Sequence, residues 1–119
     1  MSQSPRFFTP PSRVRRVAPS EAAELVSSGK AVLVDVRHPD EWVDTGVAEP
    51  ALLITLRDLG GPAGRELVDQ HRDKEIIFYC LSGARSERAA EFFGQMGMRT
   101  ANAGGIGEWV EAGLPLRAV

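Results

Sequence analysis

Two short runs of large apolar residues constrain the fold of this chain more than any other feature. Residues 31–36 read AVLVDV and residues 75–80 read EIIFYC. Apolar runs of this length are typical of parallel strands that are covered on both faces. Strands that alternate with helical segments at this spacing also indicate parallel connections. The sequence therefore predicts an α/β fold in which a central parallel β-sheet is flanked by helices on both faces.

Helices are expected around these runs at 19–28, after the turn at 38–40, at 65–71, beyond residue 83 and through 109–110. Two further short strands are expected at 51–55 and 99–102. The helix beyond residue 83 has the most regular pattern, because Ala89, Phe92, Phe93 and Met96 fall at i, i+3, i+4 and i+7. Gly97 follows this apolar stripe and predicts a left-handed end to the helix.

The chain length predicts a single domain, because 119 residues leave room for only one core. Residues 1–13 contain three prolines among serines, so we expect a flexible N-terminal arm there and a folded domain over 14–119. Four arginines fall within the first sixteen residues, namely Arg6, Arg13, Arg15 and Arg16. They could form an anion-binding patch, but a solvated arm is the better interpretation.

Charge and hydropathy argue against nucleic-acid and membrane partners. The net charge of −2 and the isoelectric point of 5.7 give no general attraction to nucleic acid or to an acidic membrane surface. No apolar run approaches the ~20 residues that span a bilayer, and the start of the chain lacks the apolar stretch of a signal peptide. We therefore expect a cytoplasmic location.

The chain has one cysteine, Cys80, which cannot form an internal disulfide. Cys80 ends an expected buried strand, and the loop CLSGAR (80–85) leads from it into a helix whose first N–H groups have no partners within the helix. This environment favours a thiolate, which is the nucleophilic form of cysteine. Gly83 can adopt the positive φ that converging loop amides require, and Arg85 adds charge and donors for an anionic substrate. The simpler alternative is a small core residue at a strand end.

The sequence resembles the rhodanese family over residues 14–116. Four stretches carry the resemblance in order: VLVDVRHPDEW (32–42), IIFYCLSGARS (76–86), AAEFFGQMGM (89–98) and AGGIGEWVEAGLPL (103–116). The resemblance implies a rhodanese-like domain in which Cys80 becomes a persulfide. The loop around the outer sulfur would then comprise Leu81, Ser82, Gly83, Ala84 and Arg85. Asp35 and Arg37 would support the site from the neighbouring strand end, although a purely structural ion pair is an equal alternative.

One stretch departs from the family pattern. Many members have Gly-His-Ile-Pro-Gly-Ala after the Glu-aromatic pair, whereas residues 46–51 read GVAEPA, with Val47 in place of the histidine. The two histidines of the chain, His38 and His71, are not candidates for a general base. Two scattered histidines and one cysteine also make a poor metal site, so we expect no metal and no cofactor.

The resemblance implies a sulfurtransferase that moves a sulfane sulfur from a small donor such as thiosulfate to cyanide, a thiol or a protein acceptor. Two other functions compete with it. A cysteine-dependent phosphatase or arsenate reductase places five residues between cysteine and arginine, whereas only four separate Cys80 from Arg85 here. A catalytically silent binding or regulatory module would retain the fold without turnover. The physiological donor, the acceptor and the oligomeric state are left open by the sequence.

Overall fold

A computed structural model of the chain describes residues 14–119, and the expected arm at 1–13 lies outside the described residues. A five-stranded sheet has the order β1-β6-β5-β2-β4, and every neighbouring pair is parallel. Its strands are β1 (Arg15–Arg16), β2 (Ala31–Asp35), β4 (Leu52–Leu53), β5 (Glu75–Cys80) and β6 (Thr100–Gly105). A separate antiparallel pair joins β3 (Val47–Ala48) to β7 (Leu116–Arg117). The prediction of an α/β fold with a central parallel sheet is confirmed.

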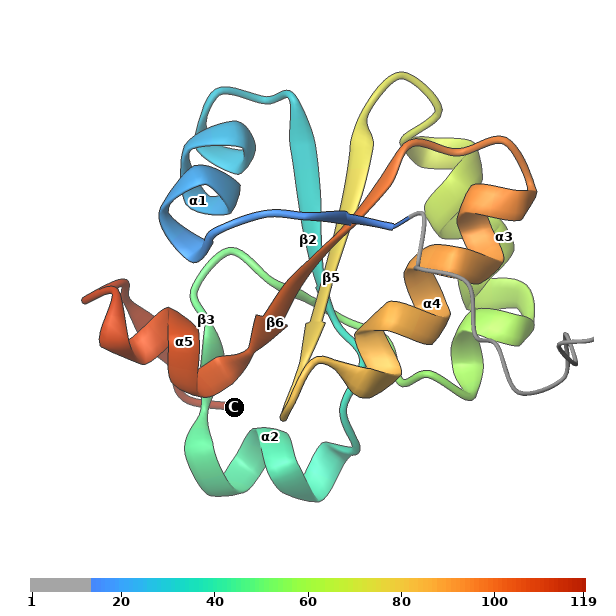
Figure 1. Cartoon of the computed structure of the whole chain (residues 1–119). Coiled ribbons are helices and arrows are strands. Elements are labelled where there is room, and N and C mark those ends of the chain that lie inside the picture. The colour runs from blue at the N-terminus through green and yellow to red at the C-terminus, as the bar shows by residue number, and fades with distance from the viewer. Residues whose placement is uncertain (1–13) are drawn as a thin grey trace, which may run out of the picture.

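Helices cover both faces of the sheet, as Figure 1 shows. They are α1 (Pro19–Ser27), α2 (Pro39–Thr45), α3 (Pro62–Gln70), α4 (Ala84–Gln95) and α5 (Ile106–Glu111), with a 3₁₀ turn, η2 (Asp58–Gly60), before α3. One apolar cluster joins the sheet to α1 and α5, and a second joins it to η2, α3 and α4. Helix α2 instead lies beyond the end of the sheet (Figure 1).

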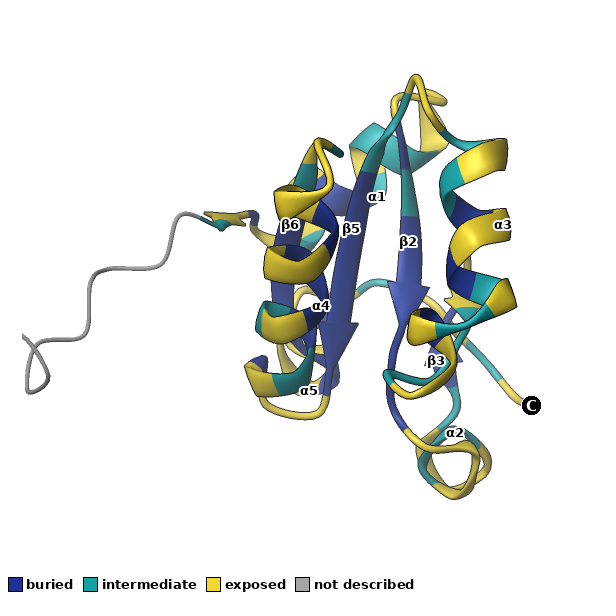
Figure 2. Ribbon diagram, turned by 90° about the vertical axis from the view of Figure 1, so that its right-hand side faces the viewer, coloured by how far each residue is buried: buried dark blue, intermediate teal, exposed yellow. Residues whose placement is uncertain are grey.

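Strand β5 lies at the centre of the sheet and is buried on both faces, as its colour in Figure 2 shows. Ile77 and Tyr79 belong to the cluster on the α1/α5 side. Phe78 and Cys80 belong to the cluster on the α3/α4 side. Successive side chains of a strand point to opposite faces, so the apolar run at 75–80 serves both layers, and the run ends with the cysteine facing α4.

The apolar stripe of α4 is only partly buried. Ala89 and Phe93 are each 1% exposed, and the Phe93 ring stacks on Phe78 with 5.7 Å between centroids. Phe92 and Met96 are 48% and 54% exposed. Two small residues, Ser86 and Ala90, complete the buried face of α4 together with Ala89 and Phe93. The expected left-handed position after the helix is confirmed at residue 97, where φ is +90°.

The short edge elements differ most from the sequence predictions. Strand β4 covers two residues of the expected 51–55, and α3 begins at Pro62, three residues before the expected start. Arg15 and Arg16 form strand β1 and so do not belong to a solvated arm. Arg15 pairs with Glu75 at 3.0 Å, and Arg16 lies 3.7 Å from Glu108. Each therefore ties β1 to another strand or helix of the domain.

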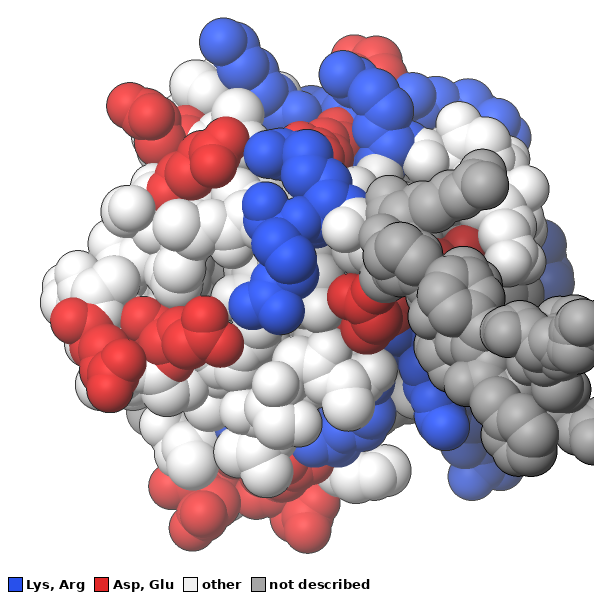
Figure 3. All heavy atoms as spheres, viewed as in Figure 1, with Lys and Arg blue, Asp and Glu red and all other residues white. Residues whose placement is uncertain are grey.

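Charged side chains of both signs are interspersed over the face of the molecule shown in Figure 3. This distribution is that of an ordinary protein surface, without a single-sign field over that face. Among the described residues, no helix is both long and apolar enough to cross a bilayer.

Candidate active site at Cys80

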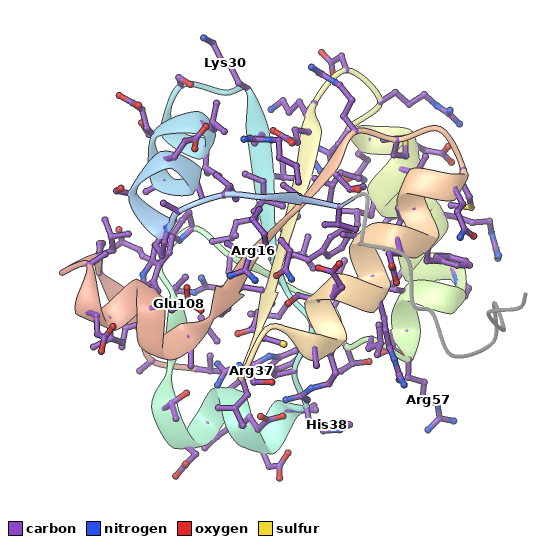
Figure 4. All side chains as sticks on the ribbon, viewed as in Figure 1. Arg16, Lys30, Arg37, His38, Arg57 and Glu108 are labelled. Carbon is purple, nitrogen blue, oxygen red and sulfur yellow. The ribbon has the colours of Figure 1, made fainter. Side chains whose placement is uncertain are left out.

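Cys80 lies at the carboxyl end of the central strand, where parallel α/β sheets commonly bind their ligands. In Figure 4, Lys30 marks the amino end of β2 and Arg37 marks its carboxyl end, beside α2. The pairing of β5 with β6 is irregular at this point: Phe78 pairs with Asn102, but Cys80 pairs with Gly105. Strand β6 therefore contains one extra residue here, a bulge of the kind that redirects side chains next to functional sites.

The loop after Cys80 curls back over the sulfur. Gly83 has φ of +98°, as the sequence predicted, and its N–H donates a hydrogen bond of 3.1 Å to Cys80 Sγ. A Cβ at this position would lie 3.4 Å from Gly104 Cα, so the two backbones approach closely. The side chains of Leu81, Ser82 and Ala84 are exposed, and these residues contribute backbone to the loop without filling it.

Two kinds of donor surround the sulfur. Besides Gly83 N–H, the hydroxyl of Ser86 lies 3.3 Å from Cys80 Sγ. Burial opposes ionisation of the cysteine, but the Ser86 hydroxyl and the N–H groups of residues 82, 83 and 86 outweigh it. The pKa of the Cys80 thiol is therefore lowered from its ordinary value. Cys80 is also 0% exposed, so its sulfur lies below the protein surface.

Asn102, on β6, holds the loop and the serine together. Its Oδ1 accepts hydrogen bonds from Ser86 Oγ at 2.7 Å and from Gly104 N at 2.9 Å. Its Nδ2 donates to the carbonyl oxygen of Gly83 at 3.0 Å and to Glu87 Oε1 at 2.9 Å. Asn102 is 1% exposed, and two of its four partners, Gly83 and Ser86, also donate hydrogen bonds to Cys80 Sγ.

Arg85 is held by an acidic residue of α2. Its two terminal nitrogens donate to the two carboxylate oxygens of Glu41 at 2.7 Å and 2.9 Å, a bidentate pair. The sequence predicted that Arg85 supplies a positive charge and donors for a transferred group or an anionic substrate. In the structure, two of its five N–H donors bind a carboxylate. The hydrogen bonds from Arg85, opposed by burial and aided by His38 N–H, lower the pKa of Glu41 to about 2.

Asp35 and Arg37 form a fully buried ion pair next to the site. Three hydrogen bonds of 2.9–3.1 Å join the guanidinium to the carboxylate, and both side chains are 0% exposed. Arg37 also donates to Thr45 Oγ1 and to the carbonyl oxygen of Gly46, each at 2.9 Å. These contacts tie the end of β2 to α2, so the geometry is that of a structural anchor for the helix that carries Glu41.

Val47 occupies the position of the family's usual histidine. It is 0% exposed and pairs with Arg117 in the small antiparallel sheet, so it is a core residue. Among the described residues, no group of three or more metal-ligating side chains could hold a metal ion.

Three residues around the site had no role assigned from the sequence: Glu41, Ser86 and Asn102. Ser86 follows the loop directly, so its position in the sequence is a signal for a hydroxyl donor near the sulfur. Asn102 is a polar residue inside an expected buried strand, a position at which an amide must find partners. The contact of Glu41 with Arg85 spans 44 positions, so no local pattern reports it.

The family model of the rhodanese-like domain matches residues 18–112. A putative sulfurtransferase of Bacillus subtilis is 31% identical over 98 residues, with 81% of this chain and 90% of the relative covered. A sulfurtransferase of Allochromatium vinosum is 31% identical over 105 residues, covering 83% of this chain and 90% of that protein. A tRNA uridine(34) hydroxylase of Citrobacter koseri is 33% identical over 109 residues, but the match spans 84% of this chain and only 31% of the hydroxylase.

Solved structures agree with the sequence comparisons. A rhodanese-related protein from Thermoplasma volcanium has a TM-score of 0.74 at 27% identity and covers 88% of this chain and 99% of its own. A Rhodopseudomonas palustris protein of unknown function, described as a possible tyrosine phosphatase, has a TM-score of 0.76 at 27% identity, with 98% and 99% coverage. With the family model matching most of its length, the chain belongs to the family of rhodanese-like domains.

Proposed function

We propose that this protein is a sulfurtransferase that carries a sulfane sulfur on Cys80 as a persulfide. The observation that carries the proposal is the environment of the sulfur, where Gly83 N–H and the Ser86 hydroxyl point at Cys80 Sγ at the end of the central strand. The sulfurtransferase relatives of similar length, matched over most of both chains, support the same reaction class.

The reaction proceeds by two displacements. The Cys80 thiolate attacks the outer sulfur of a donor such as thiosulfate, a new S–S bond forms, and sulfite leaves with the electron pair of the broken S–S bond. A thiophilic acceptor such as cyanide or a thiol then attacks the outer sulfur, and the Cys80 thiolate is released with its electron pair. The loop N–H groups favour the anionic forms of both the thiolate and the persulfide.

A second candidate is a rhodanese-like module without turnover, and the full burial of Cys80 favours it. The hydrogen bonds from Gly83 N–H and the Ser86 hydroxyl to Cys80 Sγ support chemistry instead, because they favour the thiolate, the nucleophilic form of cysteine.

A phosphatase reaction is a weaker candidate, although one structural neighbour is described as a possible tyrosine phosphatase. Four residues separate Cys80 from Arg85, and the guanidinium already binds a carboxylate through both terminal nitrogens. A loop of this size fits a single sulfur atom better than a tetrahedral oxyanion. The hydroxylase relatives are about three times as long as the matched segment, so their activity is not assigned to this chain.

Formation of thiocyanate from thiosulfate and cyanide tests the proposal in solution. Initial rates measured at several concentrations of each substrate should give the parallel double-reciprocal lines of a two-step exchange. Cys80→Ser should abolish turnover while the far-UV circular dichroism stays that of the unsubstituted protein. Turnover that survives this substitution would refute the role of Cys80. We also place the reaction in the cytoplasm, as the sequence predicts.

A further inference from the structure

We propose that Glu41 determines which sulfur donors the site accepts: by neutralising Arg85, it disfavours the thiosulfate dianion relative to donors of lower negative charge. This inference rests on the proposed sulfurtransferase function. It names a specificity-determining residue that acts through Arg85.

The geometry of the pair carries the inference. The two carboxylate oxygens of Glu41 accept hydrogen bonds of 2.7 Å and 2.9 Å from the two terminal nitrogens of Arg85. The side chains are 23% and 26% exposed, so the pair is partly shielded from solvent. A bidentate contact of this kind uses one edge of the guanidinium, an edge that could otherwise bind a sulfonate or sulfate group in the same way. An anionic donor that binds Arg85 therefore lies beside a carboxylate that already compensates the charge of the arginine.

Glu41 is held in place independently of Arg85. It lies in the first turn of α2, and its Oε1 also accepts a hydrogen bond of 3.0 Å from His38 N–H, as in a capping box. The low pKa of Glu41, about 2, keeps its negative charge throughout the neutral pH range. The arginine is therefore compensated in every condition in which Cys80 can react.

Arg85 lies within electrostatic reach of the reacting sulfur. The hydrogen bonds to Glu41 are the main reason that the pKa of Arg85 is raised, and the charge of the Cys80 thiolate contributes to the same shift. A donor bound at Cys80 therefore experiences the arginine and the carboxylate together. Their fields nearly cancel, so the site offers little net attraction to a dianion.

Two donors with the same reacting sulfur and different charge test this inference: thiosulfate, a dianion, and methanethiosulfonate, a monoanion that releases methanesulfinate. The variant is Glu41→Gln, which removes the charge and keeps a side-chain oxygen for His38 N–H. The electrostatic energy is proportional to the charge of the donor. The factor by which the substitution changes kcat/KM should therefore be squared for the dianion relative to the monoanion. We expect kcat/KM to rise about tenfold with thiosulfate and about threefold with methanethiosulfonate.

The matched control is Glu75→Gln. Glu75 binds Arg15 through two hydrogen bonds of 3.0 Å, the same kind of fork. It begins β5, whereas Cys80 ends it, so the two residues are separated by about 16 Å of extended strand. We expect the ratio of the two kcat/KM values to stay that of the unsubstituted protein in this control.

The outcomes separate this inference from the proposed function. The deciding quantity is kcat/KM for thiosulfate divided by kcat/KM for methanethiosulfonate. If sulfur transfer occurs and this ratio is the same in Glu41→Gln as in the unsubstituted protein, the inference alone is overturned. No transfer from either donor to the unsubstituted protein would overturn the proposed function, and the inference with it.

A second measurement does not depend on the folding of the variant. If the pair is neutral, kcat/KM of the unsubstituted protein for thiosulfate should change less than about twofold between about 20 and about 200 mM sodium chloride. A steep fall over this range would show that an uncompensated positive charge attracts the donor, and would contradict the role of Glu41.

Discussion

Removing the Ser86 hydroxyl should raise the pKa of Cys80, because this hydroxyl donates to the sulfur and favours the thiolate. Ser86 has one hydroxyl proton and two acceptors within reach, Cys80 Sγ at 3.3 Å and Asn102 Oδ1 at 2.7 Å. When Cys80 is a thiol, the Ser86 hydroxyl can donate its hydrogen bond to Asn102 Oδ1. When Cys80 ionises, the same hydroxyl can donate to the sulfur. The thiolate therefore gains a hydrogen bond to a charged group while a neutral one is lost.

The magnitude follows from the difference between these two bonds. A hydrogen bond to a charged group contributes about 1.5–3 kcal/mol and a neutral one about 0.5–1.5 kcal/mol, so the net preference for the thiolate is about 1–1.5 kcal/mol. A difference of about 1.4 kcal/mol corresponds to a factor of ten in the ratio of thiolate to thiol. Ser86→Ala removes this preference, so at neutral pH the thiolate fraction should fall by up to about tenfold.

The assay is the rate of alkylation by iodoacetamide as a function of pH, which reports on one site because Cys80 is the only cysteine. Its inflection should lie below that of an ordinary thiol in the unsubstituted protein and should move to higher pH in Ser86→Ala. Ser82→Ala is the matched control, because Ser82 acts on the sulfur through its backbone N–H and its side chain is exposed. An unchanged inflection in Ser86→Ala, or an equal shift in both variants, would refute this reasoning.

Four further substitutions test the scaffold of the site by urea unfolding. Arg37→Met should lower the free energy of unfolding by about 3–5 kcal/mol, because the Asp35 carboxylate would remain buried without its partner; a loss below about 1 kcal/mol would contradict the anchoring role. Gly83→Ala should cost about 1–3 kcal/mol because φ is +98° there, and it should slow alkylation of the thiol; an undisturbed loop would show neither effect. Phe93→Ala should cost about 3–5 kcal/mol and Phe92→Ala less than about 1 kcal/mol, since their exposed fractions are 1% and 48%; similar losses would refute this assignment of the two faces of α4.

The centre of the fold could be predicted from the sequence because its strands are long and apolar. The run at 75–80 matches β5 (Glu75–Cys80) at both ends, and the run at 31–36 exceeds β2 (Ala31–Asp35) by one residue. The edge strands β1, β3 and β7 each have two residues, which is too short for any hydrophobic period to appear. The buried face of α4 could not be predicted from its apolar stripe either. Small residues of the helix contact the sheet at positions where the stripe predicts large apolar ones.

The loop of the candidate site could be predicted because its parts are adjacent in the sequence. The strand end, the glycine with positive φ and the helix start all fall within residues 80–85. The partners of the loop come from other elements, with Glu41 on α2 and Asn102 on β6. Their contacts depend on how the helices pack across the end of the sheet, which no local pattern encodes. The pairing of Arg85 with Glu41 is the contact on which the inference about donor charge rests.

The most direct test of the central claim is the intact mass of the protein after incubation with thiosulfate, before and after addition of cyanide. The account predicts an increase of one sulfur atom, which is absent from Cys80→Ser and disappears when cyanide is added. An unchanged mass with thiosulfate and also with methanethiosulfonate would contradict the account and favour the module without turnover.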